Sequence, residues 1–302
     1  MLKIAFHPIY AHPLPEGHRF PMLKYELIPG QLLHEGTISA DNLFEPGPMH
    51  EAEILRVHDS EYWRRLKNLQ LSAKEIRKIG FPLSAQLIQR EIIIAQGTLE
   101  ASQFALEYGV AMNVAGGTHH AYAHSGEGFC LLNDQAIAAA WLLEHHLAKR
   151  ILIIDLDVHQ GNGTASIFKN ESRVFTFSMH GKDNYPMYKE QSDLDIALKA
   201  GTSDEEYLDL LQKNLPKLIH KHQADFIFYQ AGVDVLATDK LGKLSLSMAG
   251  CANRDAYVFN QAIAAGIPMV VCMGGGYSPE IKDILEAHCN TYRLAQRLWF
   301  DA

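Results

Sequence analysis

The chain has 302 residues, of which 47% are hydrophobic, and it carries a formal net charge of −8. A chain of this length can fold as one α/β unit, so we expect residues 1–302 to form a single domain. The negative charge repels phosphate backbones and argues against direct binding of nucleic acid. The four cysteines include no Cys-x-x-Cys pair, which predicts free thiols and no disulfide framework.

The first residues lack the apolar run of a signal peptide. No stretch reaches the roughly 20 apolar residues that a membrane helix needs. We therefore expect a cytoplasmic protein without a membrane span.

Short apolar runs alternate along the chain with longer amphipathic segments, which predicts a parallel sheet with helices on both faces. Runs without polar alternation are typical of strands buried on both sides. The expected strands are Lys3–Phe6, Ile151–Asp155, Val174–Ser178, Phe226–Tyr229 and Met269–Met273. The expected helices are Leu83–Tyr108, Asp134–Ala148, Asp204–His222, Met248–Ala265 and Pro279–Leu298.

The segment 181–201 differs from its surroundings, since it holds Pro186 and several charges with little periodicity. It predicts a long surface loop, and loops of this length in compact domains are often functional.

Two adjacent histidines, His119 and His120, follow a glycine pair in the sequence GGTHHA. In open parallel sheets, sites form beyond the carboxyl ends of strands, where this motif is expected to lie. A surface or hydrogen-bonded core position and a functional site explain the pair about equally well.

A strand runs directly into Asp-x-Asp-x-His, with Asp155, Asp157 and His159 at alternate positions. Alternate residues of an extended chain share a face, so these three side chains are expected to point the same way. Burying such groups without a partner would cost several kcal/mol. A carboxylate and an imidazole at this spacing can share a metal ion.

A third acidic residue, Asp234, follows the strand FIFYQ and a glycine. Asp157, His159 and Asp234 would make a set of three ligands with an open position, as catalytic zinc requires. A mixed oxygen and nitrogen set also suits ferrous iron.

Three glycines precede Tyr277 in the sequence GGGY, which predicts a tight turn that carries a phenol. The tyrosine could be a packing residue, or a hydroxyl donor to a developing oxyanion. Metal ligands, a histidine pair and such a donor at strand ends together indicate metal-assisted hydrolysis.

The motifs GGTHHA, GEGFCLLND, DLDVHQGNGT, AGVD and GGGY, in that order, resemble the histone deacetylase superfamily, which includes acetylpolyamine amidohydrolases. The forms DLDVHQGNG and VDVLATDKLGKLSLS most resemble class IV deacetylases and their bacterial relatives. The resemblance extends from Pro13 to the last expected helix. It implies the arginase–deacetylase fold, with a central, mostly parallel sheet of about eight strands flanked by helices.

The resemblance also implies an activity, the zinc-dependent hydrolysis of an N-acyl amide, and assigns the zinc to Asp157, His159 and Asp234. Acylated lysine and acetylpolyamines are the implied substrates, and small N-acyl metabolites fit the same chemistry. The oligomeric state and the preferred acyl chain are not readable from the sequence.

The resemblance makes His120 the general base and then acid, with His119 as its electrostatic neighbour and Asp155 behind His119. Tyr277 would hydrogen-bond the substrate carbonyl. Asn162 would stand behind His120, where class I enzymes have an aspartate, and an amide stabilises imidazolium less than a carboxylate does.

The resemblance further implies a narrow acyl-lysine tunnel with Gly128 and Phe129 in its wall. Either Tyr185 or Met187 would form the second wall. The other tunnel positions are Leu241 and Gly275. Arg19 would match the arginine of an internal cavity for acetate release.

The family often holds potassium or sodium beneath the active site. The matching positions here are Asp155, Asp157, His159, Ser178 and Met179, partly through backbone carbonyls.

Two other functions remain open at this level. An arginase-type ureohydrolase would need a second metal and another aspartate soon after His159, which is followed by Gln160 and Gly161. A module that binds acylated amines without turnover would have no need of the histidine pair and Tyr277 together.

Overall fold

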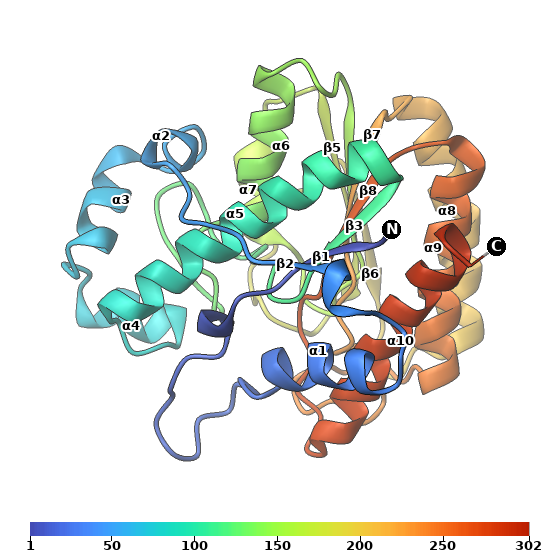
Figure 1. Ribbon diagram of the computed structural model, residues 1–302, viewed down its shortest axis with the longest axis horizontal. Helices are drawn as coiled ribbons and strands as arrows, with labels where there is room; N and C mark the ends of the chain where they lie inside the picture. Colours follow the sequence, from blue (N-terminus) through green and yellow to red (C-terminus); the bar gives the residue numbers. More distant parts are fainter. Residues whose placement is uncertain (302) are drawn as a thin grey trace.

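One sheet of eight strands, in which every neighbouring pair is parallel, runs through the middle of the protein (Figure 1). The computed structural model describes residues 1–301. The order across the sheet is β2-β1-β3-β8-β7-β4-β5-β6. The strands are β1 (Lys3–Ala5), β2 (Leu43–Phe44), β3 (Val110–Asn113), β4 (Ile151–Asp155), β5 (Val174–Gly181), β6 (Leu194–Leu198), β7 (Phe226–Gln230) and β8 (Met269–Cys272).

The central strands β3, β8, β7 and β4 are buried along their whole length. Both of their faces are covered, so their sequences are apolar without alternation. Register aligns their ends: Asp155 of β4 pairs with Gln230 of β7, and Gln230 pairs with Cys272 of β8. The residues that follow these strands therefore emerge side by side at one edge.

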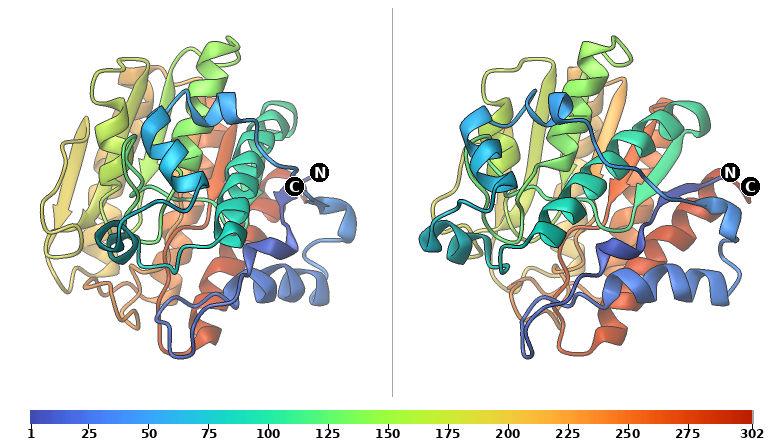
Figure 2. Two further views of the ribbon diagram at one scale, coloured as in Figure 1. Left: turned by 90° about the vertical axis from the view of Figure 1, so that its left-hand side faces the viewer. Right: turned by 60° about the vertical axis from the view of Figure 1, so that its left-hand side comes forward.

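Helices cover both faces of the sheet, as Figure 2 shows from two further directions. One face carries α5 (Ala85–Tyr108), α6 (Asp134–Glu144) and α7 (Asn162–Phe168). The other carries α1 (Lys24–His34), α8 (Asp204–His222), α9 (Met248–Ala265) and α10 (Ile281–Trp299). Three short helices, α2 (Glu51–Ile54), α3 (Ser60–Lys67) and α4 (Ala73–Ile79), lie beyond α5 (Figure 1).

The predicted α/β fold with a parallel sheet and two helical layers is confirmed, and most predicted boundaries lie within two residues of the observed ones. Serine caps fix several helix starts: the Ser203 hydroxyl accepts from the main chain of Glu206 at the start of α8. Helix α6 was predicted four residues too long, because its last turn gives way at Glu144.

The prediction that 181–201 is a long surface loop is wrong in part, because this segment contains the edge strand β6. β6 lies at the edge of the sheet beside β5 and is largely half-exposed. An edge strand lacks the continuous apolar run that identifies a central strand, so its sequence did not reveal it.

All four cysteines are buried free thiols, as predicted. Within residues 1–301, no helix combines the length and the apolarity needed to cross a lipid bilayer.

Candidate active site

Asp157, His159 and Asp234 come together just beyond the ends of β4 and β7, and all three are buried. One ligand atom from each lies within 4.8 Å of the others. His159 Nδ1 is 3.0 Å from a carboxylate oxygen of Asp157 and 3.0 Å from one of Asp234. The three residues thus converge on one point, as their positions just after two strands of the predicted sheet led us to expect.

Main-chain N–H groups fix the two carboxylates. The amide of Val158 donates to Asp234 at 3.0 Å, and the amide of Gly275 donates to Asp157 at 2.8 Å. The hydrogen bond from Gly275 requires glycine at this position, because a Cβ there would overlap the Asp234 carboxylate. The turn after β8 therefore closes directly over the two acids.

Burial and the neighbouring negative charge of Asp157 raise the pKa of Asp234 to about 7. Two carboxylates in a dry pocket are costly unless a cation neutralises them. Two carboxylate oxygens and one imidazole nitrogen form a donor set that fits zinc or ferrous iron. The residues present therefore fit a divalent metal.

His119 and His120 lie beside this group with their ring centroids 4.1 Å apart. His119 Nδ1 is 2.7 Å from Asp155, and His120 Nδ1 is 2.7 Å from the side-chain oxygen of Asn162. The expected partners of both histidines are therefore in place.

The pKa values of His119 and His120 shift in opposite directions. Burial lowers the pKa of His119, but the negative charges of Asp155 and Asp157 outweigh it and raise the value to about 9. Burial and the positive charges of His119 and His159 hold the pKa of His120 well below its usual range. His120 is therefore the neutral member of the pair and keeps a basic lone pair.

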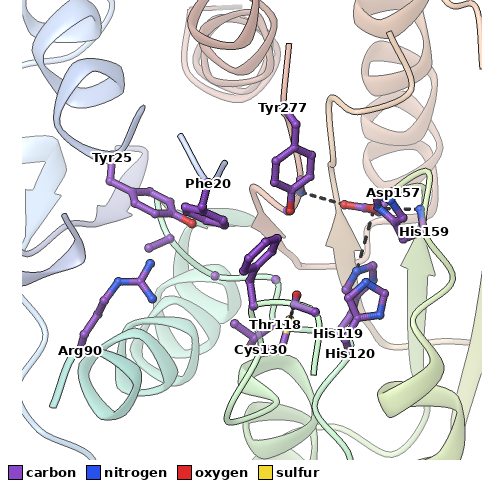
Figure 3. A pocket seen from close by; sticks show the side chains of 17 residues that line it. Phe20, Tyr25, Arg90, Thr118, His119, His120, Cys130, Asp157, His159 and Tyr277 are labelled. Carbon is purple, nitrogen blue, oxygen red and sulfur yellow. Dashed lines mark hydrogen bonds and ion pairs between the residues drawn. The ribbon is translucent and has the colours of Figure 1, made fainter. Parts of the chain in front are cut away.

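Tyr277 lies across the pocket from the two histidines (Figure 3). Its main-chain N–H donates to Asp239 at 2.6 Å, and its ring packs near Phe20 and Phe129. Burial and the charges of Asp234 and Asp157 raise the pKa of the phenol well above its usual value. The hydroxyl therefore stays protonated and can donate.

A cavity of about 250 Å³ leads from His159 and His120 to the surface, as the predicted tunnel requires. Gly128, Phe129, Tyr185 and Leu241 line it. Gly128 has a positive φ of 55° and packs so closely that a Cβ would lie 2.7 Å from the His120 ring.

Tyr185 forms the second wall, with its ring centroid 5.1 Å from that of His120. The alternative, Met187, is wrong: its side chain is 83% exposed and does not line the cavity. The loop turns between these two residues, so one points inward and the other to solvent.

A second cavity of about 40 Å³ extends inward from the metal ligands and is lined by Gly275, Cys130 and Tyr25. Arg90 lies at its far end beside Tyr25 (Figure 3). The assignment of Arg19 to this inner cavity is wrong. Arg19 is exposed and lines the outer cavity, because the chain before α1 passes over the tunnel mouth.

Ser178 and Met179, the remaining predicted positions of a monovalent ion, are buried in β5 beside β4. Ser178 pairs in register with Asp155, so the backbone of β5 passes next to the acid behind His119. The Ser178 hydroxyl lies 2.9 Å from Nδ1 of His180.

A family model described as the histone deacetylase domain matches residues 18–292. The chain belongs to the histone deacetylase family. A probable deacetylase of Archaeoglobus fulgidus is 32% identical, with 92% of this chain and 81% of the relative covered. Histone deacetylase 2 of Arabidopsis thaliana is 31% identical, with 86% and 70% covered.

An uncharacterized protein of a Picosynechococcus strain is 43% identical over 98% of this chain and 99% of its own length. Among solved structures, the crystal structure of an HDAC homolog complexed with SAHA has a TM-score of 0.82 at 24% identity. That match covers 98% of this chain and 83% of the other, and it shows the shared deacetylase fold.

Two charged residues of this deacetylase site were not singled out from the sequence. Lys24 of α1 is fully buried, and its ammonium donates to the carbonyl of Gly274 at 3.0 Å. Glu127 is buried behind Asn162, whose amide nitrogen donates to it at 2.6 Å. Glu127 stands inside the quoted motif GEGFC, but nothing in its spacing says that it is buried.

Proposed function

We propose that this histone deacetylase family member hydrolyses the amide bond of an acylated amine, with acyl-lysine as the substrate class. One observation carries the proposal: the Asp157, His159 and Asp234 group, the histidine pair and Tyr277 surround the inner end of one narrow cavity. A cavity of about 250 Å³ suits a slender acylated side chain.

Each residue has a distinct task in this chemistry. Neutral His120 takes a proton from the attacking water and later gives it to the leaving amine, which is general base and then general acid catalysis. Tyr277, held protonated, donates to the oxygen that becomes negative. His119, charged through Asp155, contributes positive charge beside the reacting centre.

Asp157, His159 and Asp234 would hold the metal, for which we propose zinc, with ferrous iron as the alternative. When bound there, such a cation supplies a Lewis acid that polarises the amide carbonyl and acidifies water.

We also propose a potassium or sodium ion close to Asp155, Asp157 and His159, next to Ser178 and Met179. The register between β4 and β5 supports it, because it brings Ser178 alongside Asp155. Deacylase activity should then rise with KCl at constant ionic strength.

The class IV assignment and a cytoplasmic location are also part of the proposal. The motif DLDVHQGNG supports the class IV assignment. That assignment in turn favours longer acyl chains as substrates. A ureohydrolase is poorly supported, because one metal-binding group is found among residues 1–301 and no second aspartate follows His159 closely.

The decisive experiment uses purified protein, a fluorogenic acetyl-lysine substrate and metal analysis. We expect about one divalent metal per chain and hydrolysis that a chelator abolishes and zinc restores. Substrates with longer acyl chains and acetylpolyamines, run in parallel, rank the substrate classes. Chelator-resistant hydrolysis, or binding without turnover of any acyl amine, would contradict the proposal.

A further inference from the structure

The mouth of the tunnel is lined by more positive than negative side chains. Arg19, Lys78 and Lys243 line the outer cavity, and Asp183 is the acidic residue of that lining. The whole chain carries a net charge of −8, so this cationic rim runs against the overall charge.

The three cations differ in whether a carboxylate of the protein already pairs with them. Lys78 forms an ion pair with the buried carboxylate of Glu127, which neutralises it. Lys243 donates to the main-chain oxygen of Asp183 at 2.8 Å and forms no ion pair with a carboxylate within residues 1–301. Arg19 lies with its guanidinium carbon 5.0 Å from the ring centroid of Phe129, a tunnel-wall residue.

Arg19 is therefore held in place by an aromatic face, while its N–H groups remain available. Within residues 1–301 it forms no ion pair with a carboxylate. A guanidinium presents a planar fork that matches a carboxylate, and a lysine ammonium adds a point charge beside it.

We propose that the preferred acyl amine carries a carboxylate on its leaving-amine side, received at the rim by Arg19 and Lys243. This inference rests on the proposed function, since it takes the acyl group to enter the tunnel. An N-acylated amino acid, such as an acyl-lysine with a free α-carboxylate, has this chemistry. An acetylpolyamine carries further cations where Arg19 and Lys243 lie, and like charges repel there.

The test uses two ligands that differ only in charge: Nα,Nε-diacetyl-lysine and its α-carboxamide. Their binding to zinc-loaded protein is measured by calorimetry in the Tyr277→Phe variant, in which turnover during the titration is slow. We expect the carboxylate form to bind about tenfold more tightly at low salt, and the preference to shrink as salt rises. Acetylputrescine should bind more weakly than either.

Two variants localise the effect. Arg19→Gln should remove most of the preference for the carboxylate form, with Lys243 keeping the remainder, and should leave the affinity for the carboxamide unchanged. Arg77→Gln, which removes an exposed charge of α4 outside the cavity lining, should keep the full preference.

Equal affinity for the two forms, or no measurable binding of the carboxylate form, overturns the proposal. If the preference is found but wild-type protein hydrolyses neither these compounds nor their counterparts with longer acyl chains, the hydrolase function fails and the charge preference stands.

A separate observation concerns Glu127, a buried carboxylate with no part in the proposed proton transfers. One of its oxygens accepts from the side-chain nitrogen of Asn162 at 2.6 Å and from the hydroxyl of Tyr185 at 2.7 Å. The other pairs with Lys78. Glu127 thus joins the residue behind His120 to the tunnel wall and to the rim.

An ionised carboxylate can only accept hydrogen bonds, so it fixes which way the Asn162 amide points. The amide nitrogen must face Glu127, which leaves the amide oxygen facing Nδ1 of His120 at 2.7 Å. An oxygen acceptor at this position requires a proton on Nδ1. The lone pair of neutral His120 is then on Nε2.

We infer that Glu127 is a positioning residue that sets the tautomer of His120 through Asn162. With glutamine in its place, either amide orientation is satisfied, and the tautomer is no longer imposed.

The test compares Glu127→Gln with Glu190→Gln, which alters a carboxylate at the far side of the same network, where Tyr122 donates at 3.3 Å. Long-range ¹H–¹⁵N NMR of the neutral ring should show an Nδ1-protonated His120 in the wild type and in Glu190→Gln, and a mixture of tautomers in Glu127→Gln. Turnover in Glu127→Gln should fall about tenfold with KM within twofold. The double variant Glu127→Gln with Asn162→Ala should have the same turnover as Asn162→Ala alone, because Glu127 acts on His120 only through Asn162.

An unchanged Nδ1 signature with wild-type turnover in Glu127→Gln overturns this inference. A lower kcat and a higher KM with an unchanged tautomer assign Glu127 to the tunnel wall through Tyr185 and overturn the inference as well.

Discussion

The hydroxyl of Tyr277 shows how a single residue gains its chemistry from its surroundings. Burial and two nearby carboxylates raise its pKa, so it stays protonated and able to donate at neutral pH. Lys24 stands close by, with its ammonium 5.9 Å from the Tyr277 ring centroid and bonded to the turn that carries the tyrosine. Burial lowers the pKa of this lysine to about 8.

Removal of the tyrosine hydroxyl is the simplest test at this scale. Tyr277→Phe should lower turnover by about 10² to 10³-fold, the usual effect of losing one oxyanion donor. Metal content should stay at the wild-type level, because Tyr277 is not among the three ligands. Wild-type turnover in this variant would refute the role of the hydroxyl.

At the scale of elements, the turn between β8 and α10 brings three parts of the site together. It supplies the N–H that binds Asp157, the carbonyl that binds Lys24, and Tyr277 itself. Its glycines let the backbone approach two metal-binding carboxylates at a distance that any side chain would prevent.

Gly275→Ala tests this close approach. The added methyl group would overlap the Asp234 carboxylate and lie 3.0 Å from that of Asp157, so we expect loss of metal and of activity. Gly30→Ala is the matched control, since Gly30 lies in α1 with nothing within 4 Å of an added Cβ. The control should be neutral or stabilise the helix by about 0.5–1 kcal/mol. Full metal content in Gly275→Ala, measured by plasma mass spectrometry, would contradict the argument.

At the scale of the whole molecule, the proposed metal joins the ends of two central strands. Its removal should therefore lower the melting temperature by several degrees. A metal that binds the folded state alone stabilises that state by about 4 kcal/mol when the free metal concentration is a thousand times Kd. Scanning fluorimetry with chelator, and then with added zinc, measures the effect. Asp234→Asn should melt at a temperature that neither treatment changes. A wild-type melting temperature that is indifferent to chelator would speak against a resident metal.

Acid should destabilise the fold through His58, which links the short N-terminal helices to α6. Its Nε2 accepts from the main chain of Asn133, the residue that caps α6. Burial lowers the pKa of His58 to about 4 from its usual value of 6.5. The unfolded chain therefore takes up a proton first, so this stability is present above pH 6.5 and is lost as the pH falls towards 4.

The expected loss between pH 7 and 4.5 is roughly 2 to 3 kcal/mol from this group. Urea denaturation at the two pH values measures it, with His58→Gln as the reference. The variant should be less stable at pH 7 and should lose less on acidification. The same pH dependence in both proteins would exclude His58 as the cause.

The resemblance to the histone deacetylases supplied the partners of both histidines. The sequence by itself determined the fold class, the central strands β4, β7 and β8 but not β3, and the metal-binding group. These depend on short-range patterns: apolar runs buried on both faces, and polar residues at alternate positions directly after a strand. Burying several such groups is costly unless they pair with one another or bind a common ion, so polar residues in this pattern indicate a binding site.

Only the tertiary structure decided the rest. Arg19 lies at the tunnel mouth and Arg90 beside the inner cavity, and Tyr185 forms the second wall of the tunnel. Lys24 and Glu127 are buried, and β6 extends the sheet at its edge. These features depend on contacts between segments far apart in the chain, such as Lys24 with Gly274. The direction of a charged side chain on a loop or at an edge is set by which distant surface covers it, and no local periodicity encodes that.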